Sequence, residues 1–285
     1  MKLQGSMKRL RRALRAVQRA HQGRHRRRLL GGHIVGVLMR TGNGVYAVDV
    51  EDDIVRPRPG GHRTHGEDEI ARALAYLDAE ANVLVVGAHV GTIAIPLARR
   101  CKALWAIEPN PNTFELLNYN VALNRAANVT PLNFAASDRD EEIEFVANRS
   151  NSGGSKRMPK IRAPIYFRDH PQILRVPARP LDRALDGTSF KLVFMDCEGS
   201  EYHALRGMVR ILAGATALFV EFLPHHLKNV AGVTPEEFVD AIGPSFARLT
   251  VPSKDLTVGR EAFKATLRAM YDADEGDAGL VFSVA

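Results

Sequence analysis

Residues 83–91 read Val-Leu-Val-Val-Gly-Ala-His-Val-Gly, and this stretch decides the fold. Its first four residues are apolar, which is typical of a short strand that is buried on both faces. Gly87 and Gly91 then allow a tight turn, after which a helix is expected at residues 91–100. The free N–H groups of a helix N-terminus favour a carboxylate or phosphate ligand. Because glycines after buried strands also serve plain tight turns, the ligand has to be inferred from the segments that follow.

Short apolar runs and helical segments alternate on both sides of this stretch. Strands are expected at residues 83–86, 103–107, 129–134, 192–195 and 217–222, and helices at residues 67–77, 91–100, 112–124 and 201–212. A polar loop is expected between the third and fourth strands, and the C-terminal part adds a helix at 235–241 and strands at 248–251 and 279–283. This alternation predicts an α/β fold, with a Rossmann-like, mostly parallel sheet and helices on both faces.

The basic residues of the chain are concentrated at its N-terminus. The chain has 39 Lys and Arg against 32 Asp and Glu, a net charge of +7, but residues 1–28 contain 11 basic residues and no acidic ones. The rest of the chain therefore carries a net charge of −4. Leu10, Leu14 and Val17 recur at helical spacing, which predicts a basic amphipathic arm suited to an anionic membrane or to nucleic acid. A solvated tail and a mitochondrial presequence have similar compositions.

The chain is expected to have three parts. These are the arm at residues 1–28, a β-hairpin with a Pro/Gly-rich connector at residues 29–66, and the α/β domain at residues 67–285. Cys101 and Cys197 lie far apart without metal-ligand spacing, which favours a reducing compartment and leaves a single disulfide as the alternative, and we expect no metal site. The apolar stretch at residues 29–39 lacks the features of a signal peptide. We therefore expect a cytoplasmic protein, which the arm could hold at a membrane surface.

The spacing of the glycines and the end of the next strand indicate the kind of ligand. Gly87 and Gly91, on either side of His89, lack the third glycine of a dinucleotide fingerprint. Strand 103–107 ends in Glu108, which could accept two hydrogen bonds from a ribose diol. This combination fits a nucleoside with a short amino-acid tail, such as S-adenosylmethionine. After strand 129–134, two alanines could wall an adenine ring, and Ser137 could contact it.

Acidic and imidazole side chains follow the next two strands. Asp196 and Glu198 come after strand 192–195, and in an extended chain they would point to the same side. Paired carboxylates can hold a sulfonium or ammonium group, or divide acid and base roles. Glu221 ends the following strand, and either of the two histidines after it could be a general base. The candidate catalytic residues are Asp196, Glu221 and His225.

Several of these segments recur in order as short motifs. They are Gly87-Ala-His-Val-Gly91, Glu108-Pro-Asn-Pro111, residues 118–124, Leu181-Asp182 and Asp196-Cys-Glu-Gly-Ser-Glu201. Over residues 67–222 the series resembles the FkbM family of S-adenosylmethionine-dependent methyltransferases. The resemblance implies a class I methyltransferase fold and O-methylation of a hydroxyl on a sugar, glycan or related small molecule. It also implies that Gly87, Gly91, Glu108 and Asn110 bind the cofactor.

The resemblance has two departures, and alternative functions follow from them and from the arm. Val85 and His89 stand where the family often has Asp and Asn. Another carboxylate would therefore have to bind the ammonium group of the methionine, and we expect it to be Asp196. An RNA methyltransferase that grips phosphates with its arm is one alternative, although the rest of the chain is acidic. A binding module that kept the fold without catalysis is another. The segment 148–160 could be a substrate-contacting lid or a surface connector.

Overall fold

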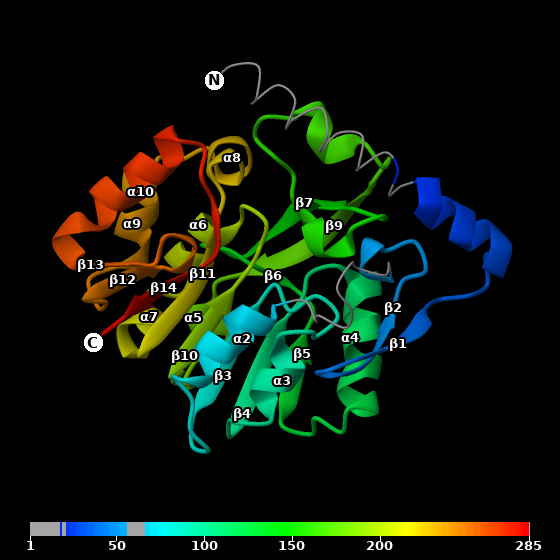
Figure 1. Ribbon diagram of the computed structural model, residues 1–285, viewed down its shortest axis with the longest axis horizontal. Coiled ribbons are helices and arrows are strands. Elements are labelled where there is room, and N and C mark those ends of the chain that lie inside the picture. The colour runs from blue at the N-terminus through cyan, green and yellow to red at the C-terminus, as the bar shows by residue number, and fades with distance from the viewer. Residues whose placement is uncertain (1–17, 19–20, 56–65, 285) are drawn as a thin grey trace.

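A mixed eight-stranded sheet forms the centre of the molecule (Figure 1). The computed structural model describes residues 18, 21–55 and 66–284, and the strand order of the sheet is β13-β12-β14-β11-β10-β3-β4-β5. The strands are β3 (Asn82–Val86), β4 (Ala103–Ile107), β5 (Val129–Leu132), β10 (Leu192–Met195), β11 (Ala217–Phe222), β12 (Arg248–Val251), β13 (Leu256–Gly259) and β14 (Asp277–Ser283). Strands β5, β4, β3, β10 and β11 run parallel, and the other three extend one edge with antiparallel pairing. The predicted mostly parallel arrangement is therefore confirmed.

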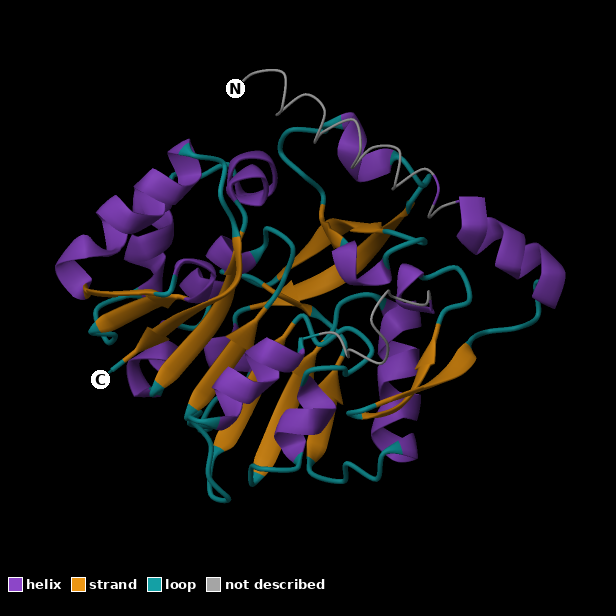
Figure 2. Cartoon of the chain, viewed as in Figure 1, coloured by secondary structure: helices purple, strands orange, loops and turns teal. Residues whose placement is uncertain are grey.

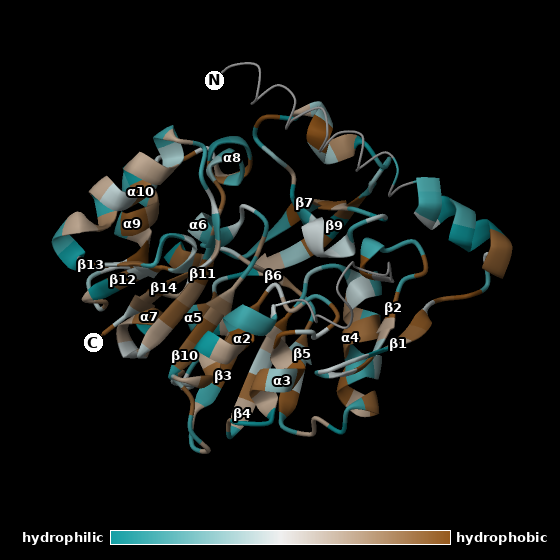
Figure 3. Cartoon of the chain, viewed as in Figure 1, coloured by the Kyte–Doolittle hydropathy of each residue, from teal (hydrophilic) through white to brown (hydrophobic). Residues whose placement is uncertain are grey.

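Alternate residues of the central strands enter hydrophobic cores on opposite faces of the sheet, as the two-residue period of a strand requires. In β3, Leu84 and Val86 belong to one core, whereas Val83 and Val85 belong to the other. Helices of the first core are α5 (Leu181–Ala184), α6 (Glu201–Arg206), α7 (Val209–Gly214), α9 (Pro235–Ile242) and α10 (Phe263–Asp272), and those of the second are α2 (Glu67–Leu74), α3 (Ala94–Ala98) and α4 (Pro111–Leu123). Helices thus cover both faces (Figure 2), and the strands are mostly apolar (Figure 3).

The prediction of a polar loop between β5 and β10 is wrong, because much of this stretch forms a second sheet of order β6-β9-β7-β8. Its strands are β6 (Ala135–Ala136), β7 (Glu141–Ala147), β8 (Lys156–Arg157) and β9 (Gln172–Arg179). Ile143 and Phe145 on β7 and Val176 and Ala178 on β9 are buried together, two residues apart on each strand. This alternation is the signature of a sheet with one buried face, and the abundant charged residues occupy the other positions.

The helix expected at residues 201–212 is two helices, α6 and α7, separated near Gly207. A Cβ at Gly207 would lie 1.9 Å from the backbone oxygen of Ser137, so the chain passes too close to the second sheet for any other residue. Helix α7 then starts anew, because the carboxylate of Asp182 accepts the backbone N–H groups of Arg210 and Ile211 at 2.8 and 3.0 Å.

The predicted hairpin is present as β1 (Val37–Thr41) and β2 (Gly44–Val48), and side chains of α4 hold it. Asn120 is fully buried, and its Oδ1 accepts the N–H of Ala47 at 2.5 Å. Its Nδ2 donates to the carbonyls of Ala47 and Val90, both at 2.9 Å. Asn124 makes the same pair of bonds to Val45. These two amides therefore replace a neighbouring strand along β2, and Asn120 also ties the hairpin to the glycine turn.

Replacing Asn120 with alanine is expected to lower the free energy of unfolding by about 2–4 kcal/mol, because two carbonyls and one N–H would be left buried without partners. Urea denaturation measures the loss. Asn118 is the matched control, since it lies on the exposed side of α4 and bonds only to its own helix. Equal losses for Asn118→Ala and Asn120→Ala would show that the hydrogen bonds of Asn120 to the hairpin contribute nothing to stability.

The described N-terminal helix, residues 21–30, is bound to an acidic segment at residues 49–52. Arg26 donates to the carbonyls of Val50 and Asp52 at 2.7 and 2.8 Å. Arg27 forms ion pairs with Asp49 and Glu51 at 2.8 and 3.3 Å. Residues 1–17 and 19–20, which make up most of the predicted arm, and residues 56–65 of the connector lie outside the described residues. In the described ranges, no helix has both the length and the apolar character needed to span a membrane.

Candidate active site

The turn after β3 has an unusual backbone that brings it against the end of β10. Gly87, His89 and Gly91 all have positive φ values, of 83°, 51° and 93°. A Cβ on Gly87 would lie 1.8 Å from the backbone oxygen of Asp196, so only glycine fits there. His89 adopts the left-handed conformation without being glycine, and its backbone N–H then points to Glu108.

Glu108 is buried at the end of β4, where it fixes two loops. Its Oε2 accepts the backbone N–H of His89 at 2.9 Å, and its Oε1 accepts that of Asn110 at 2.8 Å. Burial raises the pKa of Glu108 to about 7, although the two hydrogen bonds act in the opposite direction. The side chain of Asn110 caps α4 by accepting the N–H of Asn112 at 3.2 Å. Asn110 therefore binds Glu108 through its backbone N–H and caps α4 through its side-chain amide.

Two adjoining cavities lie over this turn. The first cavity, of about 40 Å³, is lined by residues that include Gly87, His89, Glu108, Ala135, Ala136, Ile143, Phe145 and Asp196. The second cavity, of about 190 Å³, shares Gly87, His89 and Asp196 with the first and adds Asp52, Thr92 and Glu198. Ser137 lies behind this wall, where its hydroxyl donates to Glu141 and accepts from Arg157, both at 2.9 Å. The structure thus brings together the predicted site residues from β3, β4 and β10, and gives Ser137 another role.

Asp196 is a buried carboxylate with an unsatisfied oxygen. Its Oδ1 has no hydrogen-bond partner, and burial together with Glu198 and Glu201 raises its pKa well above the ordinary range. A cation in either cavity would offset both effects. The chain is not extended at Glu198, which has a φ of 55°, yet Asp196 and Glu198 both border the second cavity. Asp196 borders the first and second cavities, whereas Glu198 borders the second and a third.

The third cavity, of about 390 Å³, lies beside Glu198 and contains a buried charged cluster at its wall. The ammonium of Lys156 lies 3.2 Å from Oε2 of Glu198 and 3.4 Å from Nε2 of His226. Nδ1 of His226 lies 3.4 Å from Glu198 and 3.7 Å from Glu221. These side chains come from β8, the turn after β10, β11 and α8 (Pro224–His226). Lys156 and His226 were not among the predicted catalytic residues.

His226 and Glu221 of this cluster favour their neutral forms. Burial lowers the pKa of His226, and burial together with Asp196 and Glu198 raises that of Glu221. As the pH rises, Glu221 loses its proton and leaves a carboxylate beside the imidazole, which is the arrangement of a general base. Glu198, Glu221 and His226 are close enough to ligate a metal ion, within 4.8 Å of one another, but the ammonium of Lys156 already supplies positive charge at Glu198. The ring of His225 lies 4.2 Å from that of His226, tilted by 49°, and also lines the third cavity.

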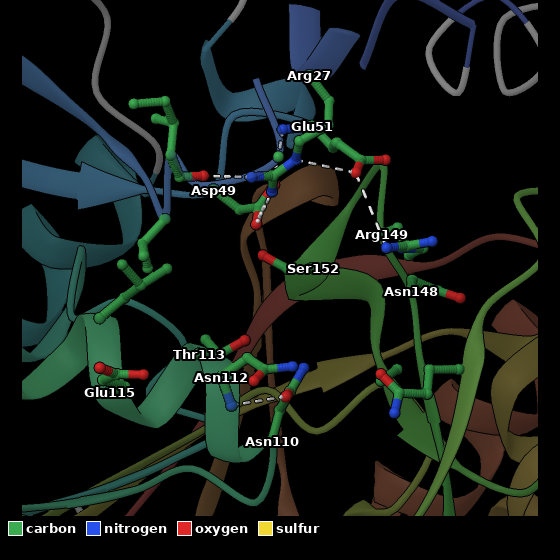
Figure 4. A pocket seen from close by; sticks show the side chains of 16 residues that line it. Arg27, Asp49, Glu51, Asn110, Asn112, Thr113, Glu115, Asn148, Arg149 and Ser152 are labelled. Carbon is green, nitrogen blue, oxygen red and sulfur yellow. Dashed lines mark hydrogen bonds and ion pairs between the residues drawn. The ribbon is translucent and has the colours of Figure 1, made fainter. Parts of the chain in front are cut away.

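The segment 148–156 separates these cavities and is bonded to the glycine turn. Nε2 of His89 lies 2.6 Å from Oγ of Ser152, and the backbone N–H of Ser152 donates to Asp52 at 2.8 Å. Ser152 also borders a fourth cavity, of about 230 Å³, next to the N-terminal helix (Figure 4). Figure 4 shows Arg27 between Asp49 and Glu51 at one side of that cavity. The segment is therefore a partition with a 3-10 turn at Ser152–Gly154, and its residues line all four cavities.

The buried carboxyls give the protein a predictable pH dependence. Glu201 accepts the N–H of Cys197 at 2.8 Å, and burial raises its pKa from 4.5 to about 7. The folded state therefore holds a proton that the unfolded state has lost, so this contribution to stability is full below pH 4.5 and is lost as the pH rises through about 7. Glu201→Gln should reduce this slope in thermal unfolding measured from about pH 5 to about pH 8, and the part due to Glu108, Asp196 and Glu221 should stay. Glu80→Gln, which changes an exposed carboxyl, should keep it, and a slope unchanged in Glu201→Gln would contradict the assignment.

Comparison with known proteins decides the family. Residues 86–243, from the end of β3 to beyond α9, match the model of the methyltransferase FkbM domain. The chain belongs to the FkbM methyltransferase family. The resemblance drawn from the sequence is thus confirmed, as are the class I methyltransferase fold and the assignment as a methyltransferase enzyme.

Relatives of this FkbM protein differ in what their names say they act on. Hexuronic acid methyltransferase AglP of Haloferax volcanii is 27% identical over 203 residues, which cover 68% of this chain and 77% of AglP. A tRNA(Phe) (4-demethylwyosine(37)-C(7)) aminocarboxypropyltransferase of Methanocaldococcus jannaschii is 36% identical over 89 residues, which cover 30% of this chain and 35% of that protein.

Solved structures with similar folds include an FkbM methyltransferase of Methylobacillus flagellatus and Trm5b of Pyrococcus abyssi. The first has a TM-score of 0.39 at 17% identity and covers 71% of this chain and 43% of that one. The second has a TM-score of 0.45 at 14% identity and covers 89% of this chain and 57% of that one. The chain thus spans about a third of the tRNA-modifying relative and little more than half of Trm5b.

Proposed function

We propose that this FkbM protein is an S-adenosylmethionine-dependent O-methyltransferase that acts on a hydroxyl of a sugar or related small molecule. The observation that carries the proposal is that Glu108 and Asp196 lie against one glycine turn, next to a cavity lined by His226, whose imidazole lies 3.7 Å from Glu221. A nucleoside with a cationic tail requires groups such as Glu108 and Asp196. Removal of a hydroxyl proton requires a base such as His226 with Glu221. The family match and the relation to AglP, a sugar-acid methyltransferase by name, support this combination.

The cavities suit the cofactor in three respects. Glu108 is a buried carboxyl that can accept from a ribose diol, as in nucleotide sites of α/β folds. Ala135 and Ala136 offer a small apolar wall for the adenine ring. Asp196 has an oxygen without a partner, which fits an ammonium or sulfonium group. When bound, the cofactor supplies an activated methyl group, whose bond to sulfur breaks as the acceptor oxygen bonds to carbon.

The residues of the chain contribute alignment and proton removal. Holding two reactants in line can lower the barrier by roughly 7–11 kcal/mol, and the partition at residues 148–156 would keep both in adjoining cavities. The hydroxyl proton passes to His226, and the carboxylates of Glu198 and Glu221 stabilise the imidazolium that forms, because they lie 3.4 and 3.7 Å from Nδ1. Asp196 serves the cofactor in this scheme, and His225 serves as a wall of the acceptor cavity.

Methyl transfer to a panel of acceptors tests the function. The full chain is incubated with cofactor labelled in its methyl group and with monosaccharides, lipid-linked glycans or RNA, and the methylated position is located by mass spectrometry. We expect an O-methylated sugar. Calorimetry on the same protein measures cofactor binding by itself. Absence of cofactor binding would refute the proposal, whereas labelled RNA as the sole product would establish the second candidate function.

That second candidate, an RNA methyltransferase, has specific support from the basic composition of residues 1–28 and from the relative whose name includes tRNA. Binding through phosphates would weaken steeply with salt, with a slope of about 0.7–0.9 per neutralised phosphate. A weak salt dependence would refute this candidate.

We further propose that the enzyme is cytoplasmic and that it associates peripherally with anionic membranes through its basic arm. Flotation with acidic liposomes compares the full chain with a chain that starts at His21, because the shorter chain keeps the contacts of Arg26 and Arg27. We expect the full chain to float and the shorter one to remain in solution. Equal recovery of both would contradict a role of the arm.

A further inference from the structure

The third cavity has polar atoms that the protein itself leaves unsatisfied. Among the described residues that line this cavity, Nη1 of Arg168, Oδ1 of Asn148 and Nδ1 of His226 are shielded from solvent and have no hydrogen-bond partner. Nδ1 of His226 at least faces Glu198, at 3.4 Å, which leaves Arg168 and Asn148 for a ligand. Such atoms cost about 1–3 kcal/mol each when they stay unpaired, and more when the group is charged. Their position on one cavity indicates groups that a bound molecule would supply.

Arg168 lacks the carboxylate that neighbouring arginines have. Arg157, Arg162 and Arg175 of the same region form ion pairs with Glu141, Glu144 and Glu142. Within the described part of the chain, Arg168 has no such pair.

The two carboxylates that line the same cavity, those of Asp169 and Glu198, are already engaged. Oδ2 of Asp169 accepts the N–H groups of Arg149 and Ser150 and the hydroxyl of Ser150, at 2.9 to 3.0 Å. Glu198 is paired with the ammonium of Lys156. The guanidinium of Arg168 therefore has no ion-pair partner among the described residues of the cavity wall.

The chemistry of Arg168 and Asn148 defines a ligand. A guanidinium presents N–H groups in a planar fork that matches a carboxylate or a phosphate. Asn148 uses its Nδ2 to donate to Gly154 at 2.6 Å, so its free Oδ1 can only accept, as from a sugar hydroxyl. One group thus suits an anion and the other a hydroxyl.

We propose that the acceptor is an anionic sugar, whose carboxylate or phosphate binds Arg168 while one of its hydroxyls receives the methyl group. This inference rests on the proposed function, since it concerns the acceptor cavity of the same site. Lys156 does not take this role, because its ammonium is held by Glu198 and lies 5.2 Å above the ring of Tyr166. Arg168 is the residue that separates acidic from neutral sugars.

The test compares Arg168→Gln and Arg168→Lys with the control Arg162→Gln, whose side chain is 65% exposed and lies outside the lining of the cavity. The acceptors are a uronic acid, the corresponding neutral hexose and the hexose phosphate, which distinguish carboxylate from phosphate. We expect the wild type to prefer one anionic sugar, and Arg168→Gln to raise its KM by about 10–100-fold without changing that of the neutral sugar. Arg168→Lys should recover part of the loss, because it restores charge without the fork.

A measurement of binding alone separates this inference from the proposed function. Saturation-transfer NMR detects the uronic acid or hexose phosphate on the wild type, and calorimetry detects the cofactor. Equal use of neutral and anionic sugars, equal losses for both in Arg168→Gln, or methylation of the carboxylate itself would overturn the inference while cofactor binding and transfer still supported the enzyme. Absence of cofactor binding would instead overturn the proposed function.

Discussion

Glu108→Ala is expected to weaken cofactor binding by about 100-fold or more in calorimetry, because a hydrogen bond to a charged group contributes about 1.5–3 kcal/mol and several are lost together. The variant loses the acceptor for the ribose and also the bonds that hold the N–H groups of His89 and Asn110. Glu108→Gln should be nearly as weak, since its NH₂ group would face one of these N–H donors.

Binding to the wild type should also depend on pH. The pKa of Glu108 is about 7 in the free protein, and an ionised carboxylate accepts hydrogen bonds more strongly than a neutral one. The affinity should therefore increase from about pH 6 to about pH 8, and this increase should be smaller in Glu108→Gln. Glu80→Gln, at a side chain 86% exposed, is the control for both effects. Wild-type affinity in Glu108→Ala would exclude this carboxyl from the ribose site.

His226→Gln is expected to lower kcat by about 10²–10⁴-fold, the usual contribution of a general base, while cofactor affinity stays near that of the wild type. Glu221→Gln should act in the same direction, because the imidazolium would lose a carboxylate 3.7 Å away. Since the pKa of Glu221 is raised, kcat of the wild type should increase as the pH rises. In Glu221→Gln this increase of kcat with pH should be smaller. Single-turnover rates at several pH values measure both effects.

His33→Gln, at an exposed turn outside the cavities, is the control for replacing a histidine. A loss confined to KM of the acceptor would show that His226 only positions the sugar. His225→Gln, in the same assay, tests the residue that the sequence favoured. If His225→Gln lost kcat and His226→Gln did not, the assignment of the two histidines would have to be exchanged.

The central sheet was predictable because its signals are local. Four or five apolar residues followed by a glycine turn or a polar strand end mark β3, β4, β10 and β11, and each was expected within one or two residues of its place. The second sheet carried a local signal too, the alternation of Ile143 and Phe145, which its many charged neighbours obscured. The break at Gly207 had no local signal, because it depends on the approach of Ser137 from another part of the chain.

The site residues also divide into those with a local signal in the sequence and those that depend on distant parts of the chain. Gly87, Glu108 and Asp196 lie directly at strand ends, so the topology alone brings them together. Lys156 lies in a stretch rich in glycine and serine, and only the pairing of β8 with β7 buries its ammonium beside Glu198. Which of two adjacent histidines faces the carboxylates depends on the helical turn at Pro224–His226, which their sequence does not determine.

The contacts of the N-terminal helix have a consequence for experiments on shortened forms of the enzyme. Arg26 donates to the backbone of Asp52, Asp52 accepts from Ser152, and Ser152 lies 2.6 Å from the imidazole of His89 in the glycine turn. A protein trimmed to residue 29 would lose the first link of this series and expose an acidic edge. Its Michaelis constant for the methyl donor should rise, although nothing that touches the donor has been removed. An arm deleted to study membrane targeting would then also impair catalysis, and the two effects would be confounded.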